Sequence, residues 1–284
     1  NRIRPVVYGI LYIGILLLYT GCSTSPEGRT DIQSAGRAAV IQPDYNSIIV
    51  PANIAPLNFV IKETGTAYFI RIHSKNGSAI QVQSKSGCMQ IPRQSWRQLL
   101  AGNPGQDLKI DIYVQDGNGK WTQFNSMVNR IAQESMDGYL VYRKFGPLFN
   151  LWKKMGIFQR NLENFDEKPV LLNSQTLNNC MNCHNFWQNG TDQWLLHLRS
   201  DPGTAMLLII NGEIRNVKTK TKINPPAAYP AWHPSGKIIA FSCSNLLQFF
   251  HSSGGECRDV LDRSSDLILY DIASNTVTTT PQIA

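Results

Sequence analysis

Five consecutive residues near the middle of the chain, Cys180-Met181-Asn182-Cys183-His184, have the pattern C-x-x-C-H. This pattern is typical of c-type haem attachment. Each of the two thiols adds to one haem vinyl group, and the histidine that follows supplies an axial nitrogen to the iron. We therefore expect one covalent haem c, attached through Cys180 and Cys183, with His184 as a ligand of its iron.

Two other uses of these residues remain open. A redox or disulfide pair of the thioredoxin type would follow a hydrophobic strand, whereas the residues before this motif, Leu177-Asn178-Asn179, do not form one. A zinc site would need two more ligands at finger-like spacing, and Cys243 and Cys257 are too distant along the chain for that. Haem attachment is the favoured interpretation.

A second iron ligand has to come from another part of the chain. His197, in the apolar stretch Leu195-Leu196-His197-Leu198, is the first candidate, and it would make the metal site His184 and His197. His233 and His251 are the next candidates. Met155 and Met206 are further alternatives, and a methionine would raise the reduction potential relative to two histidines. A histidine that simply packs within a strand is an equally good account of His197.

The N-terminus predicts export. Arg2 and Arg4 precede an uncharged apolar run at 6–19, which has the length of a signal-peptide core and is short for a membrane span. The run ends in Tyr19-Thr20-Gly21-Cys22, which resembles a bacterial lipoprotein signal, although that family usually has leucine at the position of Tyr19. The resemblance implies a signal peptide at 1–21 and a lipid on Cys22. An ordinary secretory signal or an anchor helix would also export the chain.

Charge and composition indicate the class of partner. The chain has 27 basic and 20 acidic residues, and removal of 1–21 would leave 25 basic residues and a net charge of +5. No cluster of lysine and arginine with interleaved aromatic residues is present in the sequence, so nucleic acid is not an expected partner. The expected partners are membrane lipid, through Cys22, and a redox protein.

Three further cysteines remain after these assignments. Cys243 and Cys257 flank a loop rich in glycine and serine and are candidates for a disulfide. Cys88, next to Met89, is expected to be a small buried hydrophobic residue.

The first part of the chain is expected to be β-structure. Residues 22–42 contain few apolar side chains and are interpreted as a flexible tether. Residues 43–137 then show short β-branched or aromatic runs separated by turn residues, which predict an antiparallel β-sandwich domain of the immunoglobulin type. The expected elements are strands at 47–50, 57–63, 67–74, 79–84 and 107–115 and a short helix at 95–101.

The second part is divided in two. Residues 138–189 are expected to be a linker and haem-attachment segment, with a strand at 139–143, a short helix and linking segment at 148–165, and the haem motif in a loop. Residues 190–284 begin with an expected strand pair, 204–211 and 213–218, that turns at Asn211-Gly212.

Residues 229–242, Tyr-Pro-Ala-Trp-His-Pro-Ser-Gly-Lys-Ile-Ile-Ala-Phe-Ser, resemble the blade motif of TolB-type, WD-repeat-like β-propellers. The resemblance covers about 226–280 and includes the run from Asp266 to Val277. His233 and Ser235 depart from the motif, and 246–265 is a longer insert. The resemblance implies a partial propeller over 190–284, and because a propeller needs four to eight blades, we expect further blades beyond residue 284.

The combination of a haem motif with TolB-type blades in a lipoprotein resembles a family of exported proteins from relatives of Bacteroides. The resemblance implies a mostly β protein of the bacterial envelope, lipid-anchored and facing the periplasm or the cell surface. The expected function is that of a membrane-anchored c-type cytochrome in electron transfer or redox sensing. The alternative is a propeller binding or scaffold lipoprotein in which haem or the cysteine pair is structural. No nucleophile elbow, metalloprotease pair or P-loop supports an enzyme.

Overall fold

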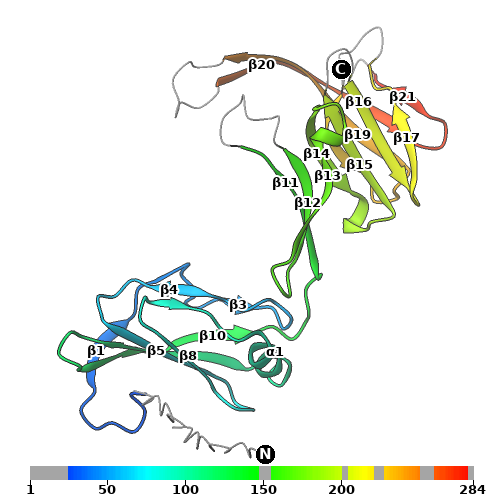
Figure 1. The fold of residues 1–284 in the computed structure, drawn as a ribbon. Helices are drawn as coiled ribbons and strands as arrows, with labels where there is room; N and C mark the ends of the chain where they lie inside the picture. The colour runs from blue at the N-terminus through cyan, green and yellow to red at the C-terminus, as the bar shows by residue number, and fades with distance from the viewer. Residues whose placement is uncertain (1–24, 147–154, 200–203, 221–226, 250–258, 281–284) are drawn as a thin grey trace, which may run out of the picture. The chain divides into compact units, whose positions relative to one another are not determined.

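The fold was analysed in a computed structural model, which describes residues 25–146, 155–199, 204–220, 227–249 and 259–280 (Figure 1). The chain is mostly β-structure, as predicted, and it divides into two compact units, Asn1–Ser135 and Met136–Ala284. The predicted signal peptide at 1–21 and the lipidation residue Cys22 lie outside the described residues. Among the helices that are described, none has the length and apolar character needed to cross a membrane.

The first unit contains one helix and ten strands among its described residues, and the six elements predicted in it are found near their expected positions. Helix α1 begins at Arg93 and ends at Ala101, and it buries Trp96, Leu99 and Leu100. The strands are β1 (Gln33–Ala38), β2 (Ile41–Gln42), β3 (Ile49–Val50), β4 (Phe59–Ile61), β5 (Ala67–His73), β6 (Ile80–Ser84), β7 (Cys88–Met89), β8 (Asp107–Gln115), β9 (Trp121–Asn125) and β10 (Met127–Ile131).

Two sheets share the core of this unit. The larger has the order β1-β9-β8-β10-β3, with β5 paired to β8 and β6 to β5, and the smaller has the order β2-β4-β7. Both sheets and α1 contribute to one buried cluster, which includes Ile70, Ile112, Phe59 and Trp96. The larger sheet is mixed and not purely antiparallel as expected, because β1 pairs with β9 and β3 with β10 in parallel.

The expected tether at 22–42 is partly wrong. Its second half forms β1 and β2, which pair with β9 and β4. The sequence Gln-Ser-Ala-Gly-Arg-Ala of β1 carries no apolar alternation, because the strand joins the sheet through its backbone and leaves most of its side chains exposed. Amino-acid composition reflects only the side chains, so it does not predict a strand that pairs through its backbone.

The second unit contains three antiparallel sheets whose neighbouring strands follow chain order. The first sheet is β11 (Tyr139–Lys144), β12 (Gly156–Asn161) and β13 (Glu167–Leu172). The second is β14 (Cys180–Phe186), β15 (Gln193–Arg199), β16 (Thr204–Ile210) and β17 (Glu213–Val217), and the third is β18 (Ala228–Trp232), β19 (Ile238–Phe249), β20 (Asp259–Asp271) and β21 (Thr276–Thr278).

The outcome of the predictions in this unit is mixed. The strand at 139–143 and the strand pair that turns at Asn211-Gly212 are confirmed. Of the short helix and linking segment expected at 148–165, the described part contains strand β12 at 156–161, between β11 and β13, and no helix. The first half of this segment, up to residue 154, lies outside the described residues. Ile157 of β12 is buried and Phe158 is partly buried, and the apolar residues of so short a segment do not distinguish a strand from a helix.

The middle of the sheet β14–β17 is buried on both faces. Leu195, Met206 and Leu208 pack with Phe241 and Ile268 of the third sheet. Leu196 and Leu198, which alternate with them along β15, pack with Met155 and Ile157 beside the first sheet. The three sheets of the second unit are therefore stacked face to face.

Candidate haem-attachment site

The C-x-x-C-H motif lies in a strand and not in the expected loop. Its five residues open β14, which occupies one edge of the sheet β14-β15-β16-β17. β14 pairs with β15 on one side, and no strand among the described residues pairs with its other side. The sequence contains no apolar alternation here because an edge strand needs only backbone hydrogen bonds to one neighbour.

A β-bulge interrupts the strand inside the motif. Asn182 pairs with His197 and Asn185 with Leu195, so three steps on β14 correspond to two on β15. The extra residue lies at Cys183-His184, between the two paired positions. In a regular strand, residues three apart point to opposite faces, and a bulge changes that parity. The bulge therefore changes which residues of β14 after it share a face with those before it.

Cys180 and His184 both lie toward the first sheet of the unit. Cys180 is partly buried and packs against the cluster that contains Met181 and Val141. The imidazole Nε2 of His184 lies 3.4 Å from the carbonyl oxygen of Val141. The side chain of Cys183 is not among those that the structure describes. The two described motif side chains thus share the neighbourhood of β11.

The environment of His184 favours the neutral imidazole. Burial lowers the pKa of His184, the contact with the Val141 carbonyl partly opposes this, and the nearby Arg143 guanidinium lowers the pKa further. A neutral imidazole is the form that binds a metal. The ring is also edge-on to Phe186, with ring centroids 6.2 Å apart, and Phe186 stacks on Trp194 at 5.5 Å. The ring of His184 is therefore bordered by aromatic side chains, and its environment favours the protonation state that a metal ligand needs.

His197 is not brought together with His184. His197 is 2% exposed and follows Leu195 on the face of β15 that packs against the third sheet. His184 contacts Val141 and Phe186 on the other face, so the sheet itself separates the two imidazoles. The expectation that both histidines hold one iron is not supported by this arrangement. The spacing of the two histidines along the chain could not predict this separation, because the face on which His184 lies depends on the bulge.

The surroundings of His197 are unusual for an imidazole. Neither ring nitrogen has a hydrogen-bond partner among the described residues. Burial lowers the pKa of His197 to about 4, with a smaller contribution from the charge of Arg199. Met206, its cross-strand partner, is 2% exposed and belongs to the same core. His197 is therefore a neutral, desolvated side chain in a hydrophobic core.

The two methionine alternatives differ in position. Met155 lies in the cluster that also contacts Cys180, and its sulfur accepts a hydrogen bond from the backbone N–H of Met181 at 3.1 Å. Met206 packs on the opposite face, with His197. Of the candidates for a second ligand, Met155 is the one on the side of Cys180 and His184.

Trp187 connects the motif strand to the turn of the next sheet. Its indole N–H donates to the carbonyl of Pro234 at 3.2 Å. Gly236 of the same turn has φ +69°, and a Cβ at this position would lie 2.8 Å from the indole ring of Trp187. The turn 233–236 joins β18 to β19 as the Pro-Ser-Gly sequence predicts. Glycine is thus required at 236 for two reasons: the backbone has a positive φ, and a Cβ would clash with the indole of Trp187.

The remaining cysteines do not form a site with the motif among the described residues. Cys243 is buried in the core of the second unit, and Cys257, its expected disulfide partner, lies outside the described residues. Cys88 is exposed, which corrects the expectation that it is buried, because alternation in β7 turns Met89 inward and Cys88 outward. No group of three or more His, Cys, Asp or Glu side chains with metal-binding geometry occurs in the described part of the chain.

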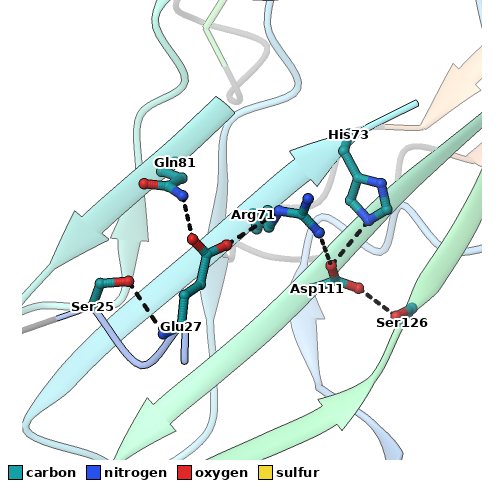
Figure 2. A network of polar contacts seen from close by, with 7 residues as sticks. All are labelled: Ser25, Glu27, Arg71, His73, Gln81, Asp111 and Ser126. Carbon is teal, nitrogen blue, oxygen red and sulfur yellow. Dashed lines mark hydrogen bonds and ion pairs between the residues drawn. The ribbon is translucent and has the colours of Figure 1, made fainter. Parts of the chain in front are cut away.

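A polar network in the first unit was not identified from the sequence. The carboxylate of Asp111 accepts from the hydroxyl of Ser126, lies 3.0 Å from His73 Nε2 and 3.7 Å from Arg71 Nη1 (Figure 2). Glu27 lies 3.1 Å from Arg71 and accepts from Gln81 at 2.5 Å. The carboxylate stands between the hydroxyl and the imidazole, so this is not the order of a serine nucleophile and its base. The cross-strand pairing of β5 with β8 produces it, and only knowledge of that register would have revealed it.

No protein-family model matches the chain, and no curated protein matches it significantly.

Proposed function

We propose that the protein is a membrane-anchored c-type cytochrome of the bacterial envelope that binds one covalent haem and acts in electron transfer or redox sensing. The observation that carries the proposal is the C-x-x-C-H motif at a bulge on the edge of a sheet, with Cys180 and His184 near β11.

The described residues fit a haem in part. Burial lowers the pKa of His184, and Phe186 borders its ring, which suits an axial ligand and the rim of an apolar pocket. Cys180 and Cys183 would hold the porphyrin through thioether bonds, and Met155 is the candidate for the second ligand. The haem, when bound, supplies one-electron chemistry. The protein would orient it, exclude water with the Phe186–Trp194 pair, and set its potential through the axial ligands.

The proposal includes the fold of the two units. In the second unit, antiparallel sheets in chain order stack face to face, as propeller blades do, and we interpret them as a partial TolB-type propeller. The first strands of successive sheets, β14 and β18, lie close together, as the inner strands of neighbouring blades would. The first unit, with two sheets around one core, is interpreted as a β-sandwich. Lipid on Cys22 would hold both units at a membrane.

The test is expression of the full chain together with a haem-attachment system. We expect an intact mass increased by one haem, a haem stain that survives denaturation, and reversible reduction seen in the absorption spectrum. A Cys180→Ala/Cys183→Ala variant should lose the haem, and Cys88→Ala, which removes an exposed thiol elsewhere, should retain it. A Cys180–Cys183 disulfide with no added mass would reject the proposal.

The alternative is a propeller scaffold in which the haem is structural, and the stacking of the three sheets favours a rigid module of this kind. Covalent haem that resists reduction by dithionite would select it over electron transfer. Retention of the secondary structure in the variant without haem would argue against it, because a structural haem is part of the folding free energy.

A further inference from the structure

A cavity of about 310 Å³ lies at the end of strands β5 and β8 in the first unit. It is partly open and is lined by His73, Ser74, Lys75, Gln106, Asp107 and Lys109 together with Gly105. Its volume is at the lower end of the range of small-molecule sites. All the residues that line it belong to the first unit.

The charge of the cavity is positive. Lys75 and Lys109 are exposed, and neither has an ion-pair partner among the described residues. Asp107 is the only carboxylate of the lining, and its backbone carbonyl accepts from the hydroxyl of Ser74 at 2.6 Å. Two unpaired ammonium groups against one carboxylate leave a net positive charge, which favours an anionic ligand.

The polar network of Figure 2 holds one wall of this cavity in place. His73 lies directly across from Lys109 in the β5–β8 pairing. Asp111 contacts the imidazole Nε2 and is itself held by Ser126 and Arg71. The other ring nitrogen, Nδ1, has no hydrogen-bond partner among the described residues. The carboxylate therefore fixes the orientation of the His73 ring.

From these observations we propose that the cavity binds the phosphate group of a small phosphorylated ligand. Lysines bind phosphate as point charges, and the volume leaves space for the organic part of a phosphate monoester. Lys75 and Lys109 contact the phosphate oxygens, and the ring of His73 completes the site.

The position of the cavity identifies one source of such a group. Glu27 is bound to Arg71, which precedes His73 by two residues and lies on the same face of β5. Five residue steps separate Glu27 from Cys22, a span of at most about 18 Å. If Cys22 is lipidated, a point that rests on the proposed function, headgroup phosphates of the membrane come close to this face. A free phosphate ester is the other source of the same chemistry.

The experiment uses the full chain with Cys22→Ser, so that no lipid anchor contributes. Glycerol phosphate is titrated calorimetrically at constant ionic strength into this protein. The variant K75Q/K109Q is compared with K62Q/K120Q, which removes the same charge from exposed lysines of the same unit that do not line the cavity. We expect saturable binding that K75Q/K109Q weakens at least about tenfold and K62Q/K120Q leaves within about twofold.

The proposal is overturned if no saturable binding is seen at about 10 mM glycerol phosphate, well above the range of typical small-molecule sites. It is also overturned if both double variants weaken binding equally, since the effect would then be one of net charge. Sedimentation with phosphatidylcholine vesicles, with and without phosphatidylglycerol, distinguishes the sources. Binding to phosphatidylglycerol that depends on Lys75 and Lys109 assigns the headgroup, and binding of glycerol phosphate alone assigns a free ester. None of these measurements requires haem or lipidation, so the outcome is independent of the proposed function.

Discussion

His184 and His197 are thirteen residues apart and lie on opposite faces of the sheet β14–β17. His184 contacts Val141 and Phe186 on one side, and His197 lies with Met206 and Leu195 on the other. The bulge at 183–184 and the alternation along β15 together produce this separation. The two residues that the sequence suggests as a ligand pair thus have different roles, and each role can be tested.

The first prediction concerns stability and pH. The pKa of His197 is about 4 in the folded protein and near 6.5 when unfolded, so the unfolded chain binds more protons between these values. The free energy of unfolding should therefore fall as pH drops from about 6.5 towards 4, by up to about 3 kcal/mol. His197→Leu should remove this dependence and stabilise the protein at pH 5 more than at pH 7.5, in urea unfolding of the chain without haem. An unchanged pH slope in the variant would show that His197 is not buried and neutral.

The second prediction concerns the iron. With haem attached, Met155→Leu should lower the reduction potential and change the visible spectrum, because a thioether ligand raises the potential. His197→Leu should leave both unchanged. Potentiometric titration followed by absorbance gives the result, with Met206→Leu as the matched control on the other face. If His197→Leu shifted the reduction potential as much as Met155→Leu does, His197 would be the better candidate for the second ligand.

The third prediction concerns the turn before β19. Gly236→Ala should lower the free energy of unfolding by about 2–4 kcal/mol, because it combines a positive φ with a contact that must displace the indole of Trp187. Gly212→Ala is the control, since Gly212 has φ +83° and nothing within 4 Å of the added Cβ. It should cost only about 1–2 kcal/mol. Equal losses in the two variants would mean that the contact with Trp187 is not tight.

The fourth prediction concerns the network in the first unit. Asp111 is 7% exposed and receives three polar partners, so Asp111→Asn should lower the free energy of unfolding by about 1–3 kcal/mol. Glu134→Gln, an exposed carboxylate of the same unit, should change it by less than about 0.5 kcal/mol. Chemical denaturation followed by tryptophan fluorescence makes the comparison. A loss of similar size in both variants would indicate a general charge effect.

The sequence predicts strands well where side chains alternate and poorly where the backbone alone decides. β8 occurs at its expected residues because one row of its side chains is apolar. β1 was missed because it pairs through its backbone and exposes polar side chains. β12 was not predicted as a strand because its apolar and polar residues do not alternate. Short-range composition does not distinguish a buried strand from a buried helix.

In the candidate site, too, some features can be predicted from the sequence and others cannot. The residue types Cys180, Cys183 and His184 can be identified from spacing because the chemistry requires that order. Their faces cannot be identified, because one extra residue in a strand reverses the direction of every side chain after it. The network at Asp111 depends on which residues of β5 and β8 are opposite each other, and no local pattern contains that register.

Strands β19 and β20 extend well beyond their neighbours, as Figure 1 shows. β18 and β21 pair with them only up to Ser242 and Leu269, and the outer part carries exposed apolar side chains at Phe249, Val260 and Leu261. Its amide protons are therefore protected by a single pair of strands, whereas those of the inner part are enclosed in the core of the sheet. Hydrogen exchange along one continuous strand should be fast at one end and slow at the other, and this distal ribbon should be the first place where a protease cuts the second unit.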